Sequence, residues 1–164
     1  MAGTTIRSFA APAAHPAGLT FDGRALWVSC IDAALIYQVD PATGKVIRSF
    51  AAPAAGSYGL AFDGRALWYC AYDLTLIYQV DPATGTAIRS FAAPSLNCWG
   101  LAFDGRWLWV LSYANNKVYQ VDPATGKVIR SFAAPAAFII DLAFDGRALW
   151  AVDYTNGKII QVNL

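Results

Sequence analysis

Ile-Arg-Ser-Phe, residues 47–50, decides the fold because the same four residues begin again at Ile6, Ile88 and Ile129. Successive copies start 41 residues apart, and four such units account for all 164 residues of the chain. A fixed period of this length is typical of repeat architectures, in which each unit is one supersecondary element. We therefore divide a single domain, residues 1–164, into the repeats 1–41, 42–82, 83–123 and 124–164.

Each repeat contains four strand-like runs rich in Leu, Ile, Val, Phe, Tyr and Trp, as pleated and mostly buried strands require. From the second repeat onward, these runs are Tyr58 to Phe62, Ala66 to Ala71, Leu76 to Asp81 and Ala87 to Ala92. Four antiparallel strands in a unit of about 40 residues match the blade of a β-propeller. The sequence therefore predicts an all-β fold with four four-stranded antiparallel blades.

Two recurring turn motifs connect these runs. Asp63-Gly64 lies between two apolar runs and predicts a two-residue hairpin, in which both central positions need positive φ. Residues 81–85, Asp-Pro-Ala-Thr-Gly, combine a fixed φ at proline with a left-handed position at glycine. They predict a second tight hairpin in each blade.

The pattern Gly-Leu-Ala-Phe-Asp-Gly-Arg-Ala-Leu-Trp at residues 59–68, with Ile-Tyr-Gln-Val-Asp-Pro-Ala-Thr-Gly-Lys at residues 36–45, resembles the short-blade propellers of the YVTN and NHL-like group. The resemblance covers the whole chain and implies the propeller fold. It says less about function, since such propellers include binding modules, surface proteins and a few enzymes such as streptogramin lyases. The four copies are nearly identical, which suggests recent amplification or design.

The ends of the chain bear on how the ring closes. With the strands of a blade named A to D from the innermost outward, the chain begins with a D strand, Thr4 to Phe9, and ends with a C strand, Lys158 to Val162. Either the chain closes on itself as a four-bladed ring, or residues 4–9 complete the last blade of a second copy. Because an open arc would expose two apolar faces, and tight 41-residue blades resemble units of larger rings, we expect an eight-bladed homodimer.

Composition excludes several classes of protein. Twelve basic and eleven acidic residues give a net charge of +1 without a basic block, so we expect no nucleic-acid partner. No apolar run reaches the ~18 residues of a membrane-spanning helix. The first residues lack the pattern of a secretory signal, so a cytoplasmic location is the default expectation. Cys30, Cys70 and Cys98 occupy unequal positions in their repeats and are expected to be free, structural thiols.

The repeats differ from one another mainly in two windows, the D-to-A connection and the B-to-C connection. In an antiparallel four-stranded blade both connections emerge on one face, which we call the variable face, while uniform hairpins occupy the other. Loops on a rigid scaffold commonly carry binding sites. Aromatic rings beside amides, carboxylates and an imidazole would suit a sugar, a peptide or a small polar molecule. The candidate ligand-binding residues are His15, Tyr58, Asn97, Trp99 and Phe138 in D-to-A connections, and Asp32, Tyr72, Asp73, Tyr113, Asn115, Tyr154 and Asn156 in B-to-C connections.

Variation in these loops also arises without a ligand, because duplicated repeats drift fastest where packing constrains them least. The three tyrosines at the end of strand B could equally be packing residues. His15 is the single histidine of the chain, which is a weak basis for general-base chemistry. The three cysteines lack metal-ligand spacing, and we expect neither a metal nor a cofactor.

These observations favour a non-enzymatic binding or scaffold propeller that pairs with itself and takes its ligand at the variable face. Asp32, Asp73, Asp141 and Asp153 make that face mildly acidic, which disfavours ligands that carry phosphate. One alternative is a structural or engineered self-assembling module without a ligand. The other is a lyase-like enzyme centred on His15.

Overall fold

The computed structural model describes residues 5–72 and 75–164, which form fifteen β-strands and no helix. Blade 1 consists of β1 (Pro16–Phe21), β2 (Leu26–Cys30), β3 (Leu35–Val39) and β4 (Val46–Ala51), and blade 2 of β5 (Ser57–Phe62), β6 (Leu67–Ala71), β7 (Leu76–Val80) and β8 (Ala87–Ala92). Blade 3 consists of β9 (Cys98–Phe103), β10 (Leu108–Ser112), β11 (Lys117–Val121) and β12 (Val128–Ala133), and blade 4 of β13 (Ile139–Phe144), β14 (Leu149–Asp153) and β15 (Lys158–Val162). The predicted all-β fold and the strands of the second repeat are confirmed.

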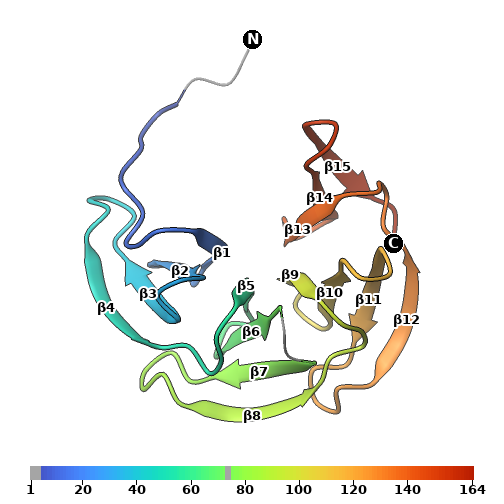
Figure 1. Ribbon diagram of the computed structural model, residues 1–164, viewed down its shortest axis with the longest axis horizontal. Coiled ribbons are helices and arrows are strands. Elements are labelled where there is room, and N and C mark those ends of the chain that lie inside the picture. The colour runs from blue at the N-terminus through green and yellow to red at the C-terminus, as the bar shows by residue number, and fades with distance from the viewer. Residues whose placement is uncertain (1–4, 73–74) are drawn as a thin grey trace.

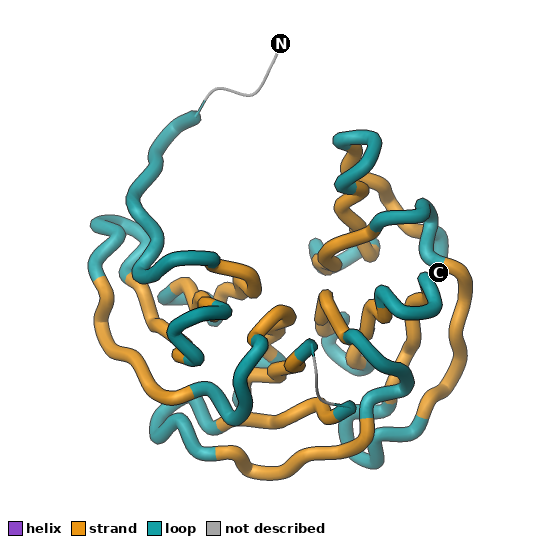
Figure 2. Tube along the Cα trace, viewed as in Figure 1, coloured by secondary structure: helices purple, strands orange, loops and turns teal. Residues whose placement is uncertain are grey.

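The four blades follow one another around a central channel (Figure 1). Each is an antiparallel meander with its strands in chain order. The innermost strands β1, β5, β9 and β13 line the channel, and β4, β8 and β12 form the outer rim. The strands of each blade lie one outside another from the channel to the rim, and loops and turns join them (Figure 2). The arc stays open between blade 1 and blade 4, so the single chain does not form a closed four-bladed ring.

The hairpin between strands A and B differs from the predicted two-residue turn. Gly23 has φ of 93°, but Asp22 does not have positive φ, and the connection runs over residues 22–25. The aspartate acts through its side chain, because Oδ1 of Asp22 accepts hydrogen bonds from the backbone N–H groups of Arg24 and Ala25. The same contacts recur in the other three blades, so carboxylate capping replaces the second positive φ.

The same aspartates also hold the core tryptophans. Asp22 accepts a third hydrogen bond, 2.8 Å long, at Oδ2 from Nε1 of Trp27, whose side chain is fully buried. Trp68 and Trp109 are bound and buried in the same way between neighbouring blades. A buried indole thereby gains both apolar contacts and a partner for its N–H group. This pairing explains why Asp and Trp recur together in every repeat.

The hairpin between strands C and D contains the predicted left-handed glycine. Gly44, Gly85 and Gly126 have φ of 73°, 76° and 73°. A Cβ on any of them would collide with a phenylalanine of the preceding D segment, Phe9, Phe50 or Phe91. Glycine is therefore required at this position for two reasons: the backbone has positive φ, and a phenylalanine ring lies where a Cβ would be.

The N-terminal segment, residues 4–9, was predicted to be a D strand that completes the last blade of the chain itself or of a second copy. In the single chain residues 5–9 lie extended and unpaired along blade 1, and residue 4 lies outside the described residues. Blade 4 correspondingly has three strands in the described residues. The physical reason is that β15, the strand that this segment would pair with, lies across the opening of the arc (Figure 1).

The three cysteines are free and buried. Burial raises the pKa of Cys70 and raises the pKa of Cys98 to about 12, so both are protonated thiols at neutral pH. None of the described segments forms a helix long and apolar enough to cross a membrane.

Candidate functional site

A β-bulge near the start of each innermost strand shapes the variable face. Ser57 pairs with Ala71 and Gly59 with Cys70, so Tyr58 is an extra residue without a partner in β6. Trp99 in β9 and Ile140 in β13 occupy the same bulged position. A bulge interrupts the ladder and re-aims a side chain. The bulges thus turn the side chains of Tyr58 and Trp99 away from the strand ladder and toward the D-to-A and B-to-C connections.

Backbone hydrogen bonds tie the two kinds of connection together. The N–H of Tyr113 donates to the carbonyl of Asn97, and the N–H of Tyr154 donates to the carbonyl of Phe138. Tyr72 makes the same bond to Gly56. Each B-to-C tyrosine is therefore held against the D-to-A connection of its own blade, which places both variable windows on one face.

Six of the predicted residues form a continuous row of rings across blades 2 to 4. Trp99 lies at the centre, with its ring stacked on Tyr113 at 4.2 Å between centroids and on Tyr58 at 5.7 Å. Phe138 meets the edge of Trp99 and continues to Tyr154, and Tyr72 contacts Tyr58 at the other end. The indole Nε1 of Trp99 is buried and has no acceptor within the described part of the chain. The row offers apolar faces, while the Trp99 indole is held mainly by packing.

His15 and Asp32 form a separate pair on blade 1. The His15 Nδ1 lies 2.6 Å from Oδ2 of Asp32, and both side chains are exposed. His15 adopts φ of 50°, and Asn97 at the equivalent position of blade 3 adopts 54°. Asp32 orients the imidazole and leaves Nε2 facing away from the pair, so the pair could exchange a proton with a bound molecule.

The predicted asparagines have local structural roles. Asn115 donates from Nδ2 to the Tyr119 hydroxyl and to the Ser95 hydroxyl. Asn156 donates from Nδ2 to Asp153, and this bond lowers the pKa of the Asp153 carboxyl. Both amides are engaged within their own blade. Asp73, the remaining candidate, lies outside the described residues.

Asp141 is the strongest departure from the repeat, and it is not among the ligand-binding residues predicted from the sequence. The other three blades have glycine at this position, Gly18, Gly59 and Gly100. A Cβ on Gly18 would lie 2.6 Å from the carbonyl oxygen of Tyr58, and one on Gly100 would lie 2.9 Å from the Cα of Asp141. Glycine therefore lets each innermost strand approach the next blade. Blade 4 has no following blade in this structure, and there the sequence places a carboxylate.

The surroundings of Asp141 perturb its ionisation. The side chain is only partly exposed, and one oxygen lies 2.9 Å from the point that a Cβ on Gly100 would occupy. Burial raises the pKa of Asp141 to about 7, although a 2.8 Å hydrogen bond from the N–H of Leu142 opposes the shift. Perturbed carboxylates of this kind cluster at functional sites. The signal in the sequence was the substitution of a charged residue at a position that otherwise requires glycine.

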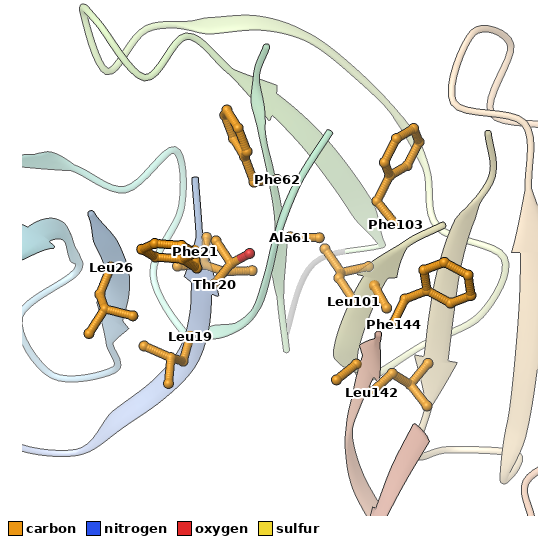
Figure 3. Close-up of a pocket in the computed structure, with 13 residues that line it drawn as sticks. Leu19, Thr20, Phe21, Leu26, Ala61, Phe62, Leu101, Phe103, Leu142 and Phe144 are labelled. Atoms are coloured by element: carbon orange, nitrogen blue, oxygen red, sulfur yellow. The ribbon is translucent and has the colours of Figure 1, made fainter. Parts of the chain in front are cut away.

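The central channel holds an apolar cavity of about 460 Å³ at its hairpin end (Figure 3). The cavity is lined by the last residues of the four innermost strands, among them Leu19, Phe62, Leu101 and Phe144. Thr20 supplies the one hydroxyl group of the lining, which contains no titratable group. The cavity has room for a small molecule but no side chain that could transfer a proton. Asp141 and the aromatic row lie at the other end of the innermost strands, on the variable face.

No three His, Cys, Asp or Glu side chains of the described residues gather as a set of metal ligands.

A sequence model of the glutamine cyclotransferase family matches residues 6–163, nearly the whole chain. The chain belongs to the glutamine cyclotransferase family. No curated protein matches the chain in sequence. The resemblance to YVTN and NHL-like propellers holds for the propeller fold, and the family is that of the cyclotransferases.

Solved structures show the same fold at low sequence identity. A glutaminyl cyclase from Myxococcus xanthus superposes with a TM-score of 0.81 at 16% identity, over 93% of this chain and 67% of that chain. A virginiamycin B lyase from Staphylococcus aureus gives 0.63 at 21% identity, over 96% and 58%. The computationally designed Ika4 protein gives 0.67 at 18% identity, over 98% of both chains.

Membership of the cyclotransferase family corrects the predicted function. The chain was predicted to be a non-enzymatic binding or scaffold propeller, and this prediction is wrong because the family is one of enzymes. The prediction failed because it depended on finding a histidine or cysteine nucleophile or a metal site. It treated Asp141 as one of several acidic residues on the variable side and did not compare it with the three equivalent glycines.

Proposed function

We propose that this cyclotransferase closes an N-terminal glutaminyl residue of a peptide into a lactam and releases ammonia, with Asp141 as the catalytic residue that moves the proton. The observation that carries the proposal is a partly buried carboxyl group at the position where the other three blades have glycine. The family supplies the class of reaction. The hairpin face carries groups that mostly recur from blade to blade, so we assign the site to the variable face.

The reaction needs one proton to be relayed. The α-amino nitrogen attacks the carbon of the side-chain amide, a C–N bond forms, and the bond from that carbon to the amide nitrogen breaks. The attacking nitrogen loses a proton and the leaving nitrogen gains one, so a single group that accepts and then donates completes the balance. A carboxyl group with pKa of about 7 populates both forms at neutral pH and suits this relay.

The aromatic row supports binding of the rest of the peptide. Trp99, Tyr58 and Tyr113 present stacked rings, and Phe138 stands three residues before Asp141 on the segment that leads into β13. Rings beside a few polar groups are typical of sites that take small amphipathic ligands. We assign His15 and Asp32 to the rim of the same site.

The test is release of ammonium from a glutaminyl dipeptide with a free amino group. The same dipeptide acetylated at its amino group is the substrate control, since its nitrogen cannot attack. Asp141→Asn should lower kcat/KM by about 10²- to 10⁴-fold, the usual effect of removing a general acid–base group. Asp122→Asn, which removes a carboxylate from a C-to-D hairpin on the opposite face, should leave kcat/KM unchanged. Equal activity of wild type and Asp141→Asn, or ammonium release from the acetylated dipeptide, would contradict the proposal.

A further inference from the structure

The outer edge of blade 4 is uncovered. Ile159 in β15 is 74% exposed, whereas its equivalents Ile36, Ile77 and Val118 are 0% exposed. In the first three blades this residue lies opposite a phenylalanine of the outermost strand, as Ile36 does with Phe50. An isolated apolar side chain at a bare strand edge indicates a missing fourth strand.

The tryptophan of blade 4 lacks a second contact. In blades 1 to 3, an arginine of strand D lies over the core tryptophan, 5.4 to 5.5 Å from the ring centroid, and donates from Nε to a glutamine of strand C. Trp150 and Gln161 occupy the equivalent positions of blade 4 and have no such arginine in the described residues. Trp150 is accordingly only partly buried.

The N-terminal segment carries the groups that blade 4 lacks. Arg7 donates to the carbonyls of Pro41 and Ala42, as Arg48 does to the hairpin of blade 2 one repeat later. Phe9 packs on Gly44, as Phe50 packs on Gly85. The segment therefore contacts blade 1 in the way that the outermost strand of a preceding blade would. The other three strands of that blade are not present in the arc.

We propose that a second copy of this chain supplies those three strands, so that residues 5–10 of each copy pair with β15 of the other. In the register of blades 1 to 3, Phe9 lies opposite Ile159, Arg7 opposite Gln161 and Ala10 opposite Lys158. The occupant is a second copy because the chain's own segment is docked on blade 1 while β15 stays bare across the opening (Figure 1). The exchange is reciprocal, as a two-fold dimer requires.

The exchange also covers the bare face of blade 1. Leu19 and Phe21 are 57% and 53% exposed there, whereas Leu60 in blade 2 is 3% exposed. A groove of about 380 Å³ on this face is lined by Phe9, Leu19, Val28 and other apolar residues. Blade 4 of the second copy buries this groove, so both apolar surfaces of the arc are removed from water by one association.

The proposed dimer completes the catalytic site, a consequence that rests on the proposed function. Phe138, in the D-to-A connection before blade 4, contacts Trp99 and Tyr113 of blade 3. In the proposed dimer the next blade belongs to the partner copy. Its D-to-A connection therefore lies beside Tyr154 of blade 4, as Phe138 lies beside Tyr113. His15 is the equivalent of Phe138, so the exchange brings the imidazole of one copy against blade 4 of the other, the blade that carries Asp141.

Disulfide trapping tests the exchange directly. A chain with Ala10→Cys and Lys158→Cys places two exposed thiols opposite each other in the proposed pairing, and the chain with Lys117→Cys and Ala133→Cys places them at the equivalent pair within blade 3. After mild oxidation, denaturing gels without reductant should show a covalent dimer for the first variant and a cross-linked monomer for the second. A cross-linked monomer from the first variant, or no cross-link while the control pair forms one, would overturn the proposal.

Activity of mixed dimers tests the shared site. Asp141→Asn and His15→Ala should each be weakly active alone, and refolding them together from denaturant should restore about a quarter of the wild-type rate, because half of the dimers are mixed and each has one intact site. Trapping of the exchanged dimer without this recovery would overturn the shared site while leaving the exchange. An inactive wild type would instead count against the proposed function.

Discussion

The three junctions between neighbouring blades and the open junction between blade 4 and blade 1 are built from the same repeat, and they differ at few positions. At the interior junctions a glycine lets the strands approach, an arginine covers a buried tryptophan, and an aliphatic residue of strand C is fully buried. In blade 4, which borders the open junction, the equivalent residues are Asp141, Trp150 without an arginine, and exposed Ile159. The repeated residues make the scaffold, and the departures gather where we place the catalytic and association functions.

Replacing the tryptophan of an interior junction should have the largest effect on stability. Trp109→Ala removes a fully buried ring and leaves a cavity, so it should lower the free energy of unfolding by about 3–5 kcal/mol. Trp150→Ala, at the open junction, should cost about half as much in the isolated chain, because that ring is only partly buried. Urea unfolding followed by circular dichroism measures both values, and equal losses would show that the two junctions are packed alike.

Stability should depend on pH through Asp141. Its pKa is raised from 3.8 to about 7 on folding, so the folded chain holds the proton more tightly, and this contribution is complete below pH ~4 and lost as pH rises through 7. The loss amounts to up to about 4 kcal/mol for a shift of about three units. Asp141→Asn should flatten this decline between pH 4 and 7. A wild type as stable at pH 7 as at pH 4 would contradict the assigned environment.

Replacing glycine by alanine should lower the stability more at an interior junction than in an open turn. Gly100→Ala places a Cβ within 3 Å of the backbone of Asp141 and Leu142, and should cost about 1–3 kcal/mol as an overpacked contact. Gly146→Ala, in a hairpin with no atom within 4 Å of the added Cβ, meets backbone strain alone at φ of 92° and should cost about 1 kcal/mol. Thermal unfolding of the two variants measures which substitution lowers the melting temperature more. Gly146→Ala would be the more costly of the two if the junction can widen freely.

The repeat made much of this fold predictable, because regular features follow from local chemistry. The period of Ile-Arg-Ser-Phe predicted the blades, and the glycine of the Asp-Pro-Ala-Thr-Gly turn has the predicted positive φ. The positive φ predicted at Asp22 was wrong, because the Asp22 carboxylate accepts hydrogen bonds from the backbone N–H groups of the turn. A second left-handed residue is then not needed. The unpaired state of residues 5–9 depends on which strand is within reach, which is a property of the assembled arc.

The site was only partly predictable. The aromatic residues were found because they vary among the repeats, and their row depends on bulges that no single repeat reveals. Asp141 was missed because the need for glycine at its position arises from the distance between neighbouring strands, which only the structure shows. The enzymatic function was missed because a fold does not specify a reaction.

The most direct test of catalysis by Asp141 is the cyclisation rate of Asp141→Gly with a glutaminyl dipeptide at pH 7. Glycine is the residue of the other three blades, so the variant should keep the fold and a melting temperature at or above that of wild type while losing ammonium release. Retained activity in a folded Asp141→Gly would contradict the assignment of catalysis to the departure from the repeat.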